Sequence, residues 1–257
     1  MKKRIFALFL SALLLVTVLC ACGDESQSEV GGTGSDGTST SGEAVTGGEL
    51  VVGISQDLGD SLDPYQMTAA GTREVLFNVY EGLVKPTSTG EYVPAVASDS
   101  TVSEDGLTYT FPLREGVLFH NGEEVTTDDV IYSFETCAET TVDTALAAAL
   151  SAVESVTADG NTITVTLSEA NPDFLSYVGM VYIVPDDYTD QATAPVGTGP
   201  FRFVSRSVQQ NLVMEKFADY WGEGASLDKV TFQIFEDSNA LMSALSAESV
   251  DMARSEE

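Results

Sequence analysis

The stretch that decides the fold is 103–122, which reads SEDGLTYTFPLREGVLFHNG. The Glu-Asp-Gly sequence at 104–106 is typical of a tight turn, and residues 108–111 then alternate between threonine and an aromatic side chain. Alternation with a period of two predicts a β-strand that buries one face. The Asn121-Gly122 pair at the end of the stretch predicts a second turn.

Outward from this stretch, the pattern predicts a mixture of helices and strands. Thr126 has the side chain of a helix N-cap, and Asp129 three positions later completes a capping pair. Because helices and strands do not alternate regularly, we expect an α/β fold rather than a β-sandwich or a helical bundle. The other expected helices are 72–81, 144–153 and 238–247, and the other expected strands are 50–54, 162–167, 201–205, 212–215 and 230–235.

The composition indicates a folded, strongly acidic protein. The chain has 257 residues, 43% of them hydrophobic, which is enough for a substantial core. Its 40 Asp and Glu outnumber its 11 Lys and Arg, and the formal net charge is −29. Such a surface would repel phosphates, so we expect no nucleic acid as partner and no docking on anionic membrane surfaces. The acidic residues are expected to form a well-solvated surface.

The first 21 residues have the pattern of an export signal. Three basic residues at 2–4 precede an apolar run at 5–19, which is shorter than a membrane-spanning helix requires. The sequence LCACG at 19–23 resembles a bacterial lipoprotein box, which implies that Cys22 carries a diacylglycerol on its sulfur after cleavage. Acyl chains would hold the protein on the outer face of the cell membrane, the periplasmic side where an outer membrane exists. A plain secretory signal is the alternative.

Residues 22–48 are predicted to be a disordered acidic tether. They consist of Gly, Ser, Thr, Asp and Glu with almost nothing apolar, so they cannot bury enough surface to offset the entropy of ordering. Folded sequence is expected from Glu49. Cys137 is the single cysteine outside the signal region, so no disulfide within the chain is expected.

The sequence contains no motif that carries covalent chemistry or holds a cofactor. His120 is the only histidine, and beside the Asn121-Gly122 pair it is expected to be a turn residue rather than a metal ligand. A Gly-x-Ser-x-Gly elbow and a Gly-x-x-x-x-Gly-Lys loop are both missing from the sequence. We therefore expect a protein that is not an enzyme, with no catalytic residue, metal site or cofactor.

Aromatic side chains are more informative about binding. Rings provide a large contact area at low entropic cost, so a group of them could line a recognition cleft, but the same rings also fill protein cores. For any single ring we expect the core. The candidates are Tyr65, Phe77, Tyr80, Tyr177, Tyr182, Tyr220 and Trp221.

A series of sequence blocks resembles one known family. These blocks are LDPY at 62–65, VYEGLV at 79–84, the stretch 103–122, TDDVIYS at 127–133, VGTGPF at 196–201, DYWG at 219–222 and LDKV at 227–230. Together they resemble the extracytoplasmic solute-binding proteins of peptide-type ABC importers, also called solute-binding protein family 5. The resemblance covers residues 49–257, and its blocks occur in the family's order.

The resemblance implies a periplasmic-binding-protein-like fold of class II. It implies a first lobe made of 49–84 and 195–257, with an inserted subdomain at 85–194. Members of the family are much longer, so the second lobe is expected to be missing and the chain to be a truncated form or part of a gene.

The resemblance also implies a function. A family member captures oligopeptides or dipeptides outside the membrane and delivers them to an ABC permease and its ATPase, and we expect it to be a monomer. The given chain is expected to bind weakly or not at all by itself. Alternatives are a receptor for a nickel chelate or another small solute, a non-binding surface lipoprotein fragment, and an extracytoplasmic hydrolase.

The residues expected nearest the ligand follow the first predicted strand. They are Gln56, Asp57, Leu58, Asp63 and Tyr65, because loops at strand ends carry the sites of mixed α/β folds. Asp57 is a candidate partner for the ammonium group of a peptide, although an ordinary solvated acid is the more common case. Arg73, near a helix start, is a candidate partner for a carboxylate and is otherwise a surface residue.

Overall fold

The computed structural model describes residues 46–254. The predicted signal segment 1–21, the predicted lipidation site Cys22 and most of the predicted tether lie outside the described residues. Folded chain begins earlier than Glu49, since Gly47 N–H donates to the Ser226 carbonyl (2.6 Å) and Gly48 N–H donates to Asp228 Oδ2 (2.9 Å). These two glycines were expected to belong to the tether, but their left-handed backbones let them pair with residues far along the chain.

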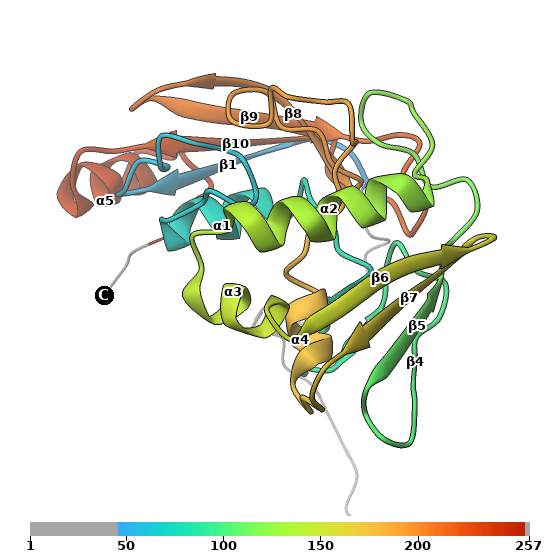
Figure 1. The fold of residues 1–257 in the computed structure, drawn as a ribbon. Coiled ribbons are helices and arrows are strands. Elements are labelled where there is room, and N and C mark those ends of the chain that lie inside the picture. Colours follow the sequence, from blue (N-terminus) through green and yellow to red (C-terminus); the bar gives the residue numbers. More distant parts are fainter. Residues whose placement is uncertain (1–45, 255–257) are drawn as a thin grey trace, which may run out of the picture. The chain divides into compact units, whose positions relative to one another are not determined.

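A five-stranded sheet forms one layer of the fold (Figure 1). Strand β1 (Glu49–Ile54) is parallel to both of its neighbours, β11 (Met252–Arg254) and β10 (Lys229–Ile234). Strands β10, β9 (Asn211–Lys216) and β8 (Phe201–Ser207) form an antiparallel meander. Helix α5 (Ser238–Ser246) connects β10 to β11, so the carboxyl ends of the three parallel strands lie at one edge of the sheet. The strand order is β11, β1, β10, β9 and β8.

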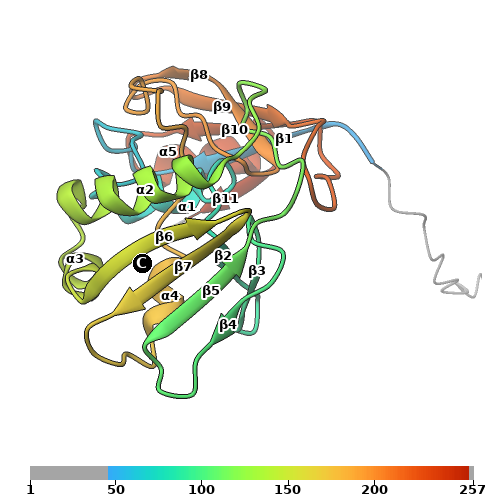
Figure 2. The same ribbon diagram turned by 45° about the vertical axis from the view of Figure 1, so that its right-hand side comes forward.

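A four-stranded antiparallel sheet forms a second layer (Figure 2). Its strands are β4 (Thr101–Val102), β5 (Thr108–Pro112), β7 (Thr162–Leu167) and β6 (Val153–Asp159), in that spatial order. The predicted alternation is confirmed, because Tyr109 and Phe111 are buried while their threonine neighbours are not. A small two-stranded sheet pairs β2 (Val84–Pro86) with β3 (Tyr92–Pro94).

Helix α2 (Thr127–Thr140) lies between the two larger sheets in both views (Figures 1 and 2). Its predicted start is confirmed: Thr126 Oγ1 accepts a hydrogen bond from Asp129 N–H, and the Asp129 carboxylate accepts one from Thr126 N–H (2.7 Å). The other helices are α1 (Ala70–Leu76), α3 (Thr144–Leu150) and α4 (Phe174–Val178).

Helix α1 ends earlier than the pattern predicts. The expected helix ran through 72–81, but the carbonyls of Asn78 and Val79 accept hydrogen bonds from Phe201 N–H (3.1 Å) and Gly199 N–H (2.9 Å). These distant partners replace helical hydrogen bonds. The predicted helix 144–153 is likewise shorter, because its last residue begins β6.

One hydrophobic core joins the layers. It includes Ile54 and Leu212 from the five-stranded sheet and Phe111 and Ile163 from the four-stranded sheet. The mixed α/β class is therefore confirmed. The predicted division into 49–84 with 195–257 and an insert at 85–194 stays a prediction. Within the described part of the chain, no helix has the length and apolar character that spanning a membrane requires.

Candidate functional site

The segment 55–65, called here the strand-end loop, connects the carboxyl end of β1 to α1. Open α/β sheets place their ligand sites outside the carboxyl ends of parallel strands. The strand-end loop holds all five residues that the sequence suggested as ligand contacts. These residues lie close together in the sequence, but the structure gives their side chains different environments.

Asp57 shapes the loop through contacts with β8 and the turn after it. Its Oδ1 accepts from its neighbour Leu58 N–H (2.7 Å) and lies 3.4 Å from Arg206 Nη2, and its Oδ2 accepts from Gln209 N–H (3.0 Å). Arg206, whose side chain is 10% exposed, also donates to the carbonyls of Leu58 (2.9 Å) and Gly59 (2.8 Å). Asp57 is therefore a structural partner of Arg206, and it is not the solvated loop acid that was the common expectation.

Three further candidates also hold the loop in shape. Asp63 Oδ1 accepts from Tyr65 N–H (2.8 Å), which closes a local turn. Tyr65 is 4% exposed and donates its hydroxyl to the Tyr182 carbonyl (2.6 Å), and its burial raises the pKa of the phenol well above the ordinary value. Leu58 is buried in the core. Their side chains therefore contribute to packing.

Gln56 is the exposed member of the five. None of the hydrogen bonds found in residues 46–254 involves its side chain or main chain. It lies in a narrow cleft with Gly71 and Val75 of α1 and with Arg254, which pairs with Glu74. Of the five candidates, Gln56 is thus the one whose side chain is open to a ligand.

Arg73 is engaged by the protein itself. Its Nη1 lies 3.1 Å from Asp143 Oδ2, and its Nη2 donates to the Met67 carbonyl (3.4 Å). Asp143 is the N-cap of α3, and its pKa is lowered first by the Leu146 N–H and also by Arg73. Arg73 therefore pairs with a carboxylate of its own chain, Asp143, rather than with that of a ligand.

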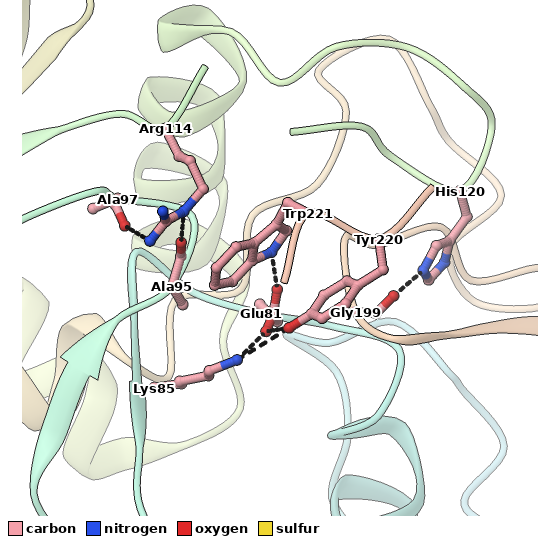
Figure 3. Close-up of polar contacts among 9 residues, drawn as sticks. All are labelled: Glu81, Lys85, Ala95, Ala97, Arg114, His120, Gly199, Tyr220 and Trp221. Carbon is pink, nitrogen blue, oxygen red and sulfur yellow. Dashed lines mark hydrogen bonds and ion pairs between the residues drawn. The ribbon is translucent and has the colours of Figure 1, made fainter. Parts of the chain in front are cut away.

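At the opposite edge of the sheet, a buried carboxylate organises five side chains, called here the Glu81 cluster: Glu81, Lys85, Arg114, Tyr220 and Trp221 (Figure 3). Glu81 is 5% exposed. Its Oε1 accepts from Lys85 Nζ (2.9 Å) and the Tyr220 hydroxyl (2.7 Å), and its Oε2 accepts from Trp221 Nε1 (2.7 Å). Burial and the neighbouring carboxylate raise the pKa of Tyr220.

The indole of Trp221 connects this carboxylate to the four-stranded layer. The guanidinium of Arg114 lies 4.2 Å from the ring centroid, and the ammonium of Lys85 lies 4.9 Å from it (Figure 3). Arg114 also donates to the carbonyls of Ala95 (3.1 Å) and Ala97 (3.3 Å). A single aromatic ring thus receives cations at two positions.

His120 is a turn residue, as the sequence predicted. Its Nε2 bonds the Gly199 carbonyl (2.9 Å), and its Nδ1 accepts from Gly197 N–H (3.3 Å). Burial lowers the pKa of the ring to about 4, so the imidazole is neutral at pH 7, with Nε2 carrying the proton. Within residues 46–254 no group of three or more His, Cys, Asp and Glu side chains is placed to hold a metal ion.

The aromatic candidates divide between core and pocket. Tyr65 and Tyr80 are buried, as expected for single rings, but Phe77 is 48% exposed. Phe77, Tyr80, Tyr182 and Tyr220 line one pocket, whereas Tyr177 and Trp221 pack against the core.

The roles of Glu81 and Arg206 were not foreseen. An acid inside the apolar block 79–84 was the available signal for Glu81, whereas no local pattern marks Arg206.

The fold defines a class of protein: an α/β lobe whose parallel strands end together at one edge of the sheet, the edge where such folds place their ligand sites. The same fold is found in the ABC transporter-associated periplasmic binding protein DppA from Helicobacter pylori, solved in complex with peptide STSA. That structure superposes with a TM-score of 0.73 at 31% identity. The match covers 80% of this chain and 46% of that chain.

Sequence comparison gives the family. The model of the bacterial extracellular solute-binding proteins, family 5 Middle, matches residues 91–256. Heme-binding protein A of Haemophilus influenzae is 33% identical over an alignment of 208 residues that covers 68% of this chain and 38% of that protein. The nickel-binding periplasmic protein of Escherichia coli is 30% identical over an alignment of 184 residues that covers 68% of this chain and 35% of that protein. The chain belongs to family 5 of the bacterial extracellular solute-binding proteins.

Proposed function

We propose that this chain supplies the first lobe of an extracytoplasmic receptor that captures peptides for an ABC importer. The observation that carries the proposal is the free main chain at the end of β1. The carbonyl of Ile54 still accepts from Phe235 N–H (2.8 Å), whereas Gln56, two residues further along the chain, has no hydrogen bond among the described residues.

An extended peptide is the solute that such an edge fits best. Two free main-chain groups just beyond the end of β1 can pair with the backbone of an extended peptide, with affinity from backbone hydrogen bonds and little demand on the peptide's sequence. The side chains of Asp57, Asp63 and Tyr65 hold the loop rather than point to a ligand, which agrees with this form of recognition. The Helicobacter pylori relative is named for its complex with a peptide, and this supports the same class of solute.

The receptor acts outside the cytoplasm in this proposal. The export signal at 1–21 would direct secretion, and acylation of Cys22 would keep the monomeric receptor at the membrane surface beside its permease and ATPase. Metabolic labelling with a radioactive fatty acid tests this part. Label on the natural chain that disappears in Cys22→Ala supports the anchor, and a Cys22→Ala chain with the same label and membrane retention contradicts it.

The given chain is expected to bind weakly by itself. It spans 35–38% of the two curated relatives and 46% of the solved structure, so the matched part is less than half of each of those proteins. A micromolar ligand corresponds to about −8 kcal/mol, and half of that, about −4 kcal/mol, corresponds to a millimolar Kd.

A thermal-unfolding panel tests the class of solute. The purified chain is heated with a pool of di- to pentapeptides, with a nickel–histidine chelate, or with heme. With peptide at about 10 mM and a Kd of about 1 mM, stabilisation of about 1.4 kcal/mol is expected from the peptide pool alone. Stabilisation by the chelate or by heme in place of the peptides would assign another solute, and no stabilisation by any of them would favour a non-binding surface fragment.

A further inference from the structure

A second pocket lies at the edge of the five-stranded sheet where β1 begins. Pro200, just before β8, and Tyr220, just after β9, are on its wall, and Phe77 lines it at the end of α1 away from the strand-end loop. The pocket has a volume of about 270 Å³. It is therefore separate from the proposed peptide edge, which follows the opposite end of β1.

The wall of this pocket is mainly aromatic. Rings of Phe77, Tyr92, Tyr182 and Tyr220 line it, and Phe77 is 48% exposed although it is a large apolar side chain. Partly exposed rings around a concave surface offer stacking and edge contacts to a flat apolar group. The wall thus favours a ligand with an aromatic body.

One polar group of the pocket has hydrogen-bonding capacity left for a ligand. The ammonium of Lys85 has three N–H groups, and within residues 46–254 it donates to two acceptors, Glu81 Oε1 and the Tyr220 hydroxyl. The Lys85 side chain is 33% exposed. Glu81 itself already accepts from three donors and is 5% exposed, so it is not available to a ligand.

The local charge is opposite to that of the whole protein. Within the Glu81 cluster, the charges of Lys85 and Arg114 outnumber the single carboxylate of Glu81, whereas the chain as a whole has a formal net charge of −29. The charged side chains that line the pocket are Lys85 and Glu81. Because Glu81 is buried and already accepts from three donors, the partly exposed Lys85 ammonium is the charge that a ligand meets. An anionic group is favoured there and an ammonium group is disfavoured.

The size of the pocket restricts the ligand further. Pockets for drug-sized ligands have volumes of about 300–1,000 Å³, and this one is smaller, which suits one ring with a short acidic arm. We propose that this pocket binds a small aromatic carboxylate, with its ring against Phe77 and Tyr92 and its carboxylate on the ammonium of Lys85.

Three probes of similar shape test the proposal on the purified chain. Phenylacetate carries the carboxylate, 2-phenylethanol is neutral, and 2-phenylethylamine carries an ammonium. Trp221 is the only tryptophan of the chain, and its indole contacts Glu81 and Lys85, which line the pocket, so its fluorescence reports on a ligand at Lys85. Saturable quenching by phenylacetate is expected, with an affinity at least about tenfold higher than that for the amine, because only the carboxylate accepts a charge-assisted hydrogen bond.

Variants separate the ring contact from the charge. Phe77→Ala is expected to weaken phenylacetate binding severalfold with an unchanged melting temperature, since the ring is half exposed. Lys85→Met is expected to abolish the preference for phenylacetate over the alcohol. Val208→Ala, which also removes an exposed apolar side chain but lies in the turn between β8 and β9, is the matched control and should bind as the natural chain does.

The outcomes decide the proposal independently of peptide binding. Equal affinity for phenylacetate and 2-phenylethylamine, or no saturable response up to about 10 mM, would overturn it. Unchanged phenylacetate binding in Phe77→Ala would also overturn it, and this variant does not disturb Glu81 as Lys85→Met does. A phenylacetate response that survives saturation with peptide would show two separate sites.

Discussion

The two edges of the five-stranded sheet use charged side chains in different ways. At the carboxyl edge, the largely buried Arg206 holds the strand-end loop by binding Asp57 and two main-chain carbonyls. Gln56, which precedes Asp57, has no main-chain hydrogen bond among the described residues. At the amino edge, Glu81 is saturated by three donors, and its cluster leaves a preformed pocket beside it.

The difference shows how a strongly acidic chain obtains specific sites. The chain has 40 Asp and Glu residues, and the two that organise these edges each bind a side chain far away in the sequence. Asp57 binds Arg206, and Glu81 binds Trp221. Hydrogen-bonded buried charges are costly to disturb, whereas exposed pairs contribute little. The predictions below test this comparison.

Arg206→Met should give the largest effect. It removes the donor from two main-chain carbonyls and from Asp57, so the free energy of unfolding should fall by about 3–5 kcal/mol, as for a broken buried ion pair. Arg202→Met is the matched control on the same strand, because Arg202 pairs with Glu215 on the surface and should lose less than about 1 kcal/mol. Denaturation with urea measures both. Equal losses in the two variants would remove the special role of Arg206.

His120 should make the amino edge sensitive to acid. Its folded pKa, about 4, lies below the ordinary value of 6.5, so the neutral ring contributes stability above pH 6.5 that is lost as the pH falls towards 4. His120→Gln removes this titration. The stability advantage of the natural chain over the variant should shrink by up to about 3 kcal/mol between pH 7 and pH 4. A difference that stays constant over this range would contradict the buried, neutral histidine.

Glu81→Gln should have a smaller effect at the same edge. The two carboxylate oxygens of Glu81 accept hydrogen bonds from three donors, whereas a glutamine amide has only one acceptor oxygen. The free energy of unfolding should therefore fall by about 1–3 kcal/mol. The fluorescence of Trp221 should shift, because its N–H loses a charged acceptor. An unchanged emission spectrum together with unchanged stability would show that the carboxylate does not organise the cluster.

Gln56→Ala should have the smallest effect on stability. The side chain is exposed and makes no hydrogen bond within residues 46–254, so the change should stay within about 0.5 kcal/mol. Peptide binding through the main chain should also survive, since alanine keeps the same N–H and carbonyl. Gln56→Pro, which lacks the N–H, should weaken peptide binding, and equal binding by both variants would argue against main-chain pairing.

Local patterns in the sequence predicted the elements that local forces determine. The strand at 162–167 and the capping pair of Thr126 and Asp129 are found where the pattern placed them. Strand β6 was missed because only Val153 and Val156 are partly buried in it, so its sequence has no period of two. Helix α1 was predicted too long because residues about 120 positions away bind the carbonyls at its end.

The sequence proposed the candidate site but did not explain it. The strand-end loop follows from the position of β1, whereas the role of Asp57 depends on Arg206, 149 residues later. No local pattern reports such a pair. The apolar neighbours of Glu81 in the sequence were an unused signal of burial, and its three donors come from residues 85, 220 and 221, which only the fold brings together.

The most direct test follows the amide chemical shifts of the isotope-labelled chain while trialanine is added. The account predicts saturable shifts concentrated at residues 53–58, with a Kd on the order of 1 mM. Shifts elsewhere with none at 53–58, or a micromolar Kd for the given chain, would contradict it.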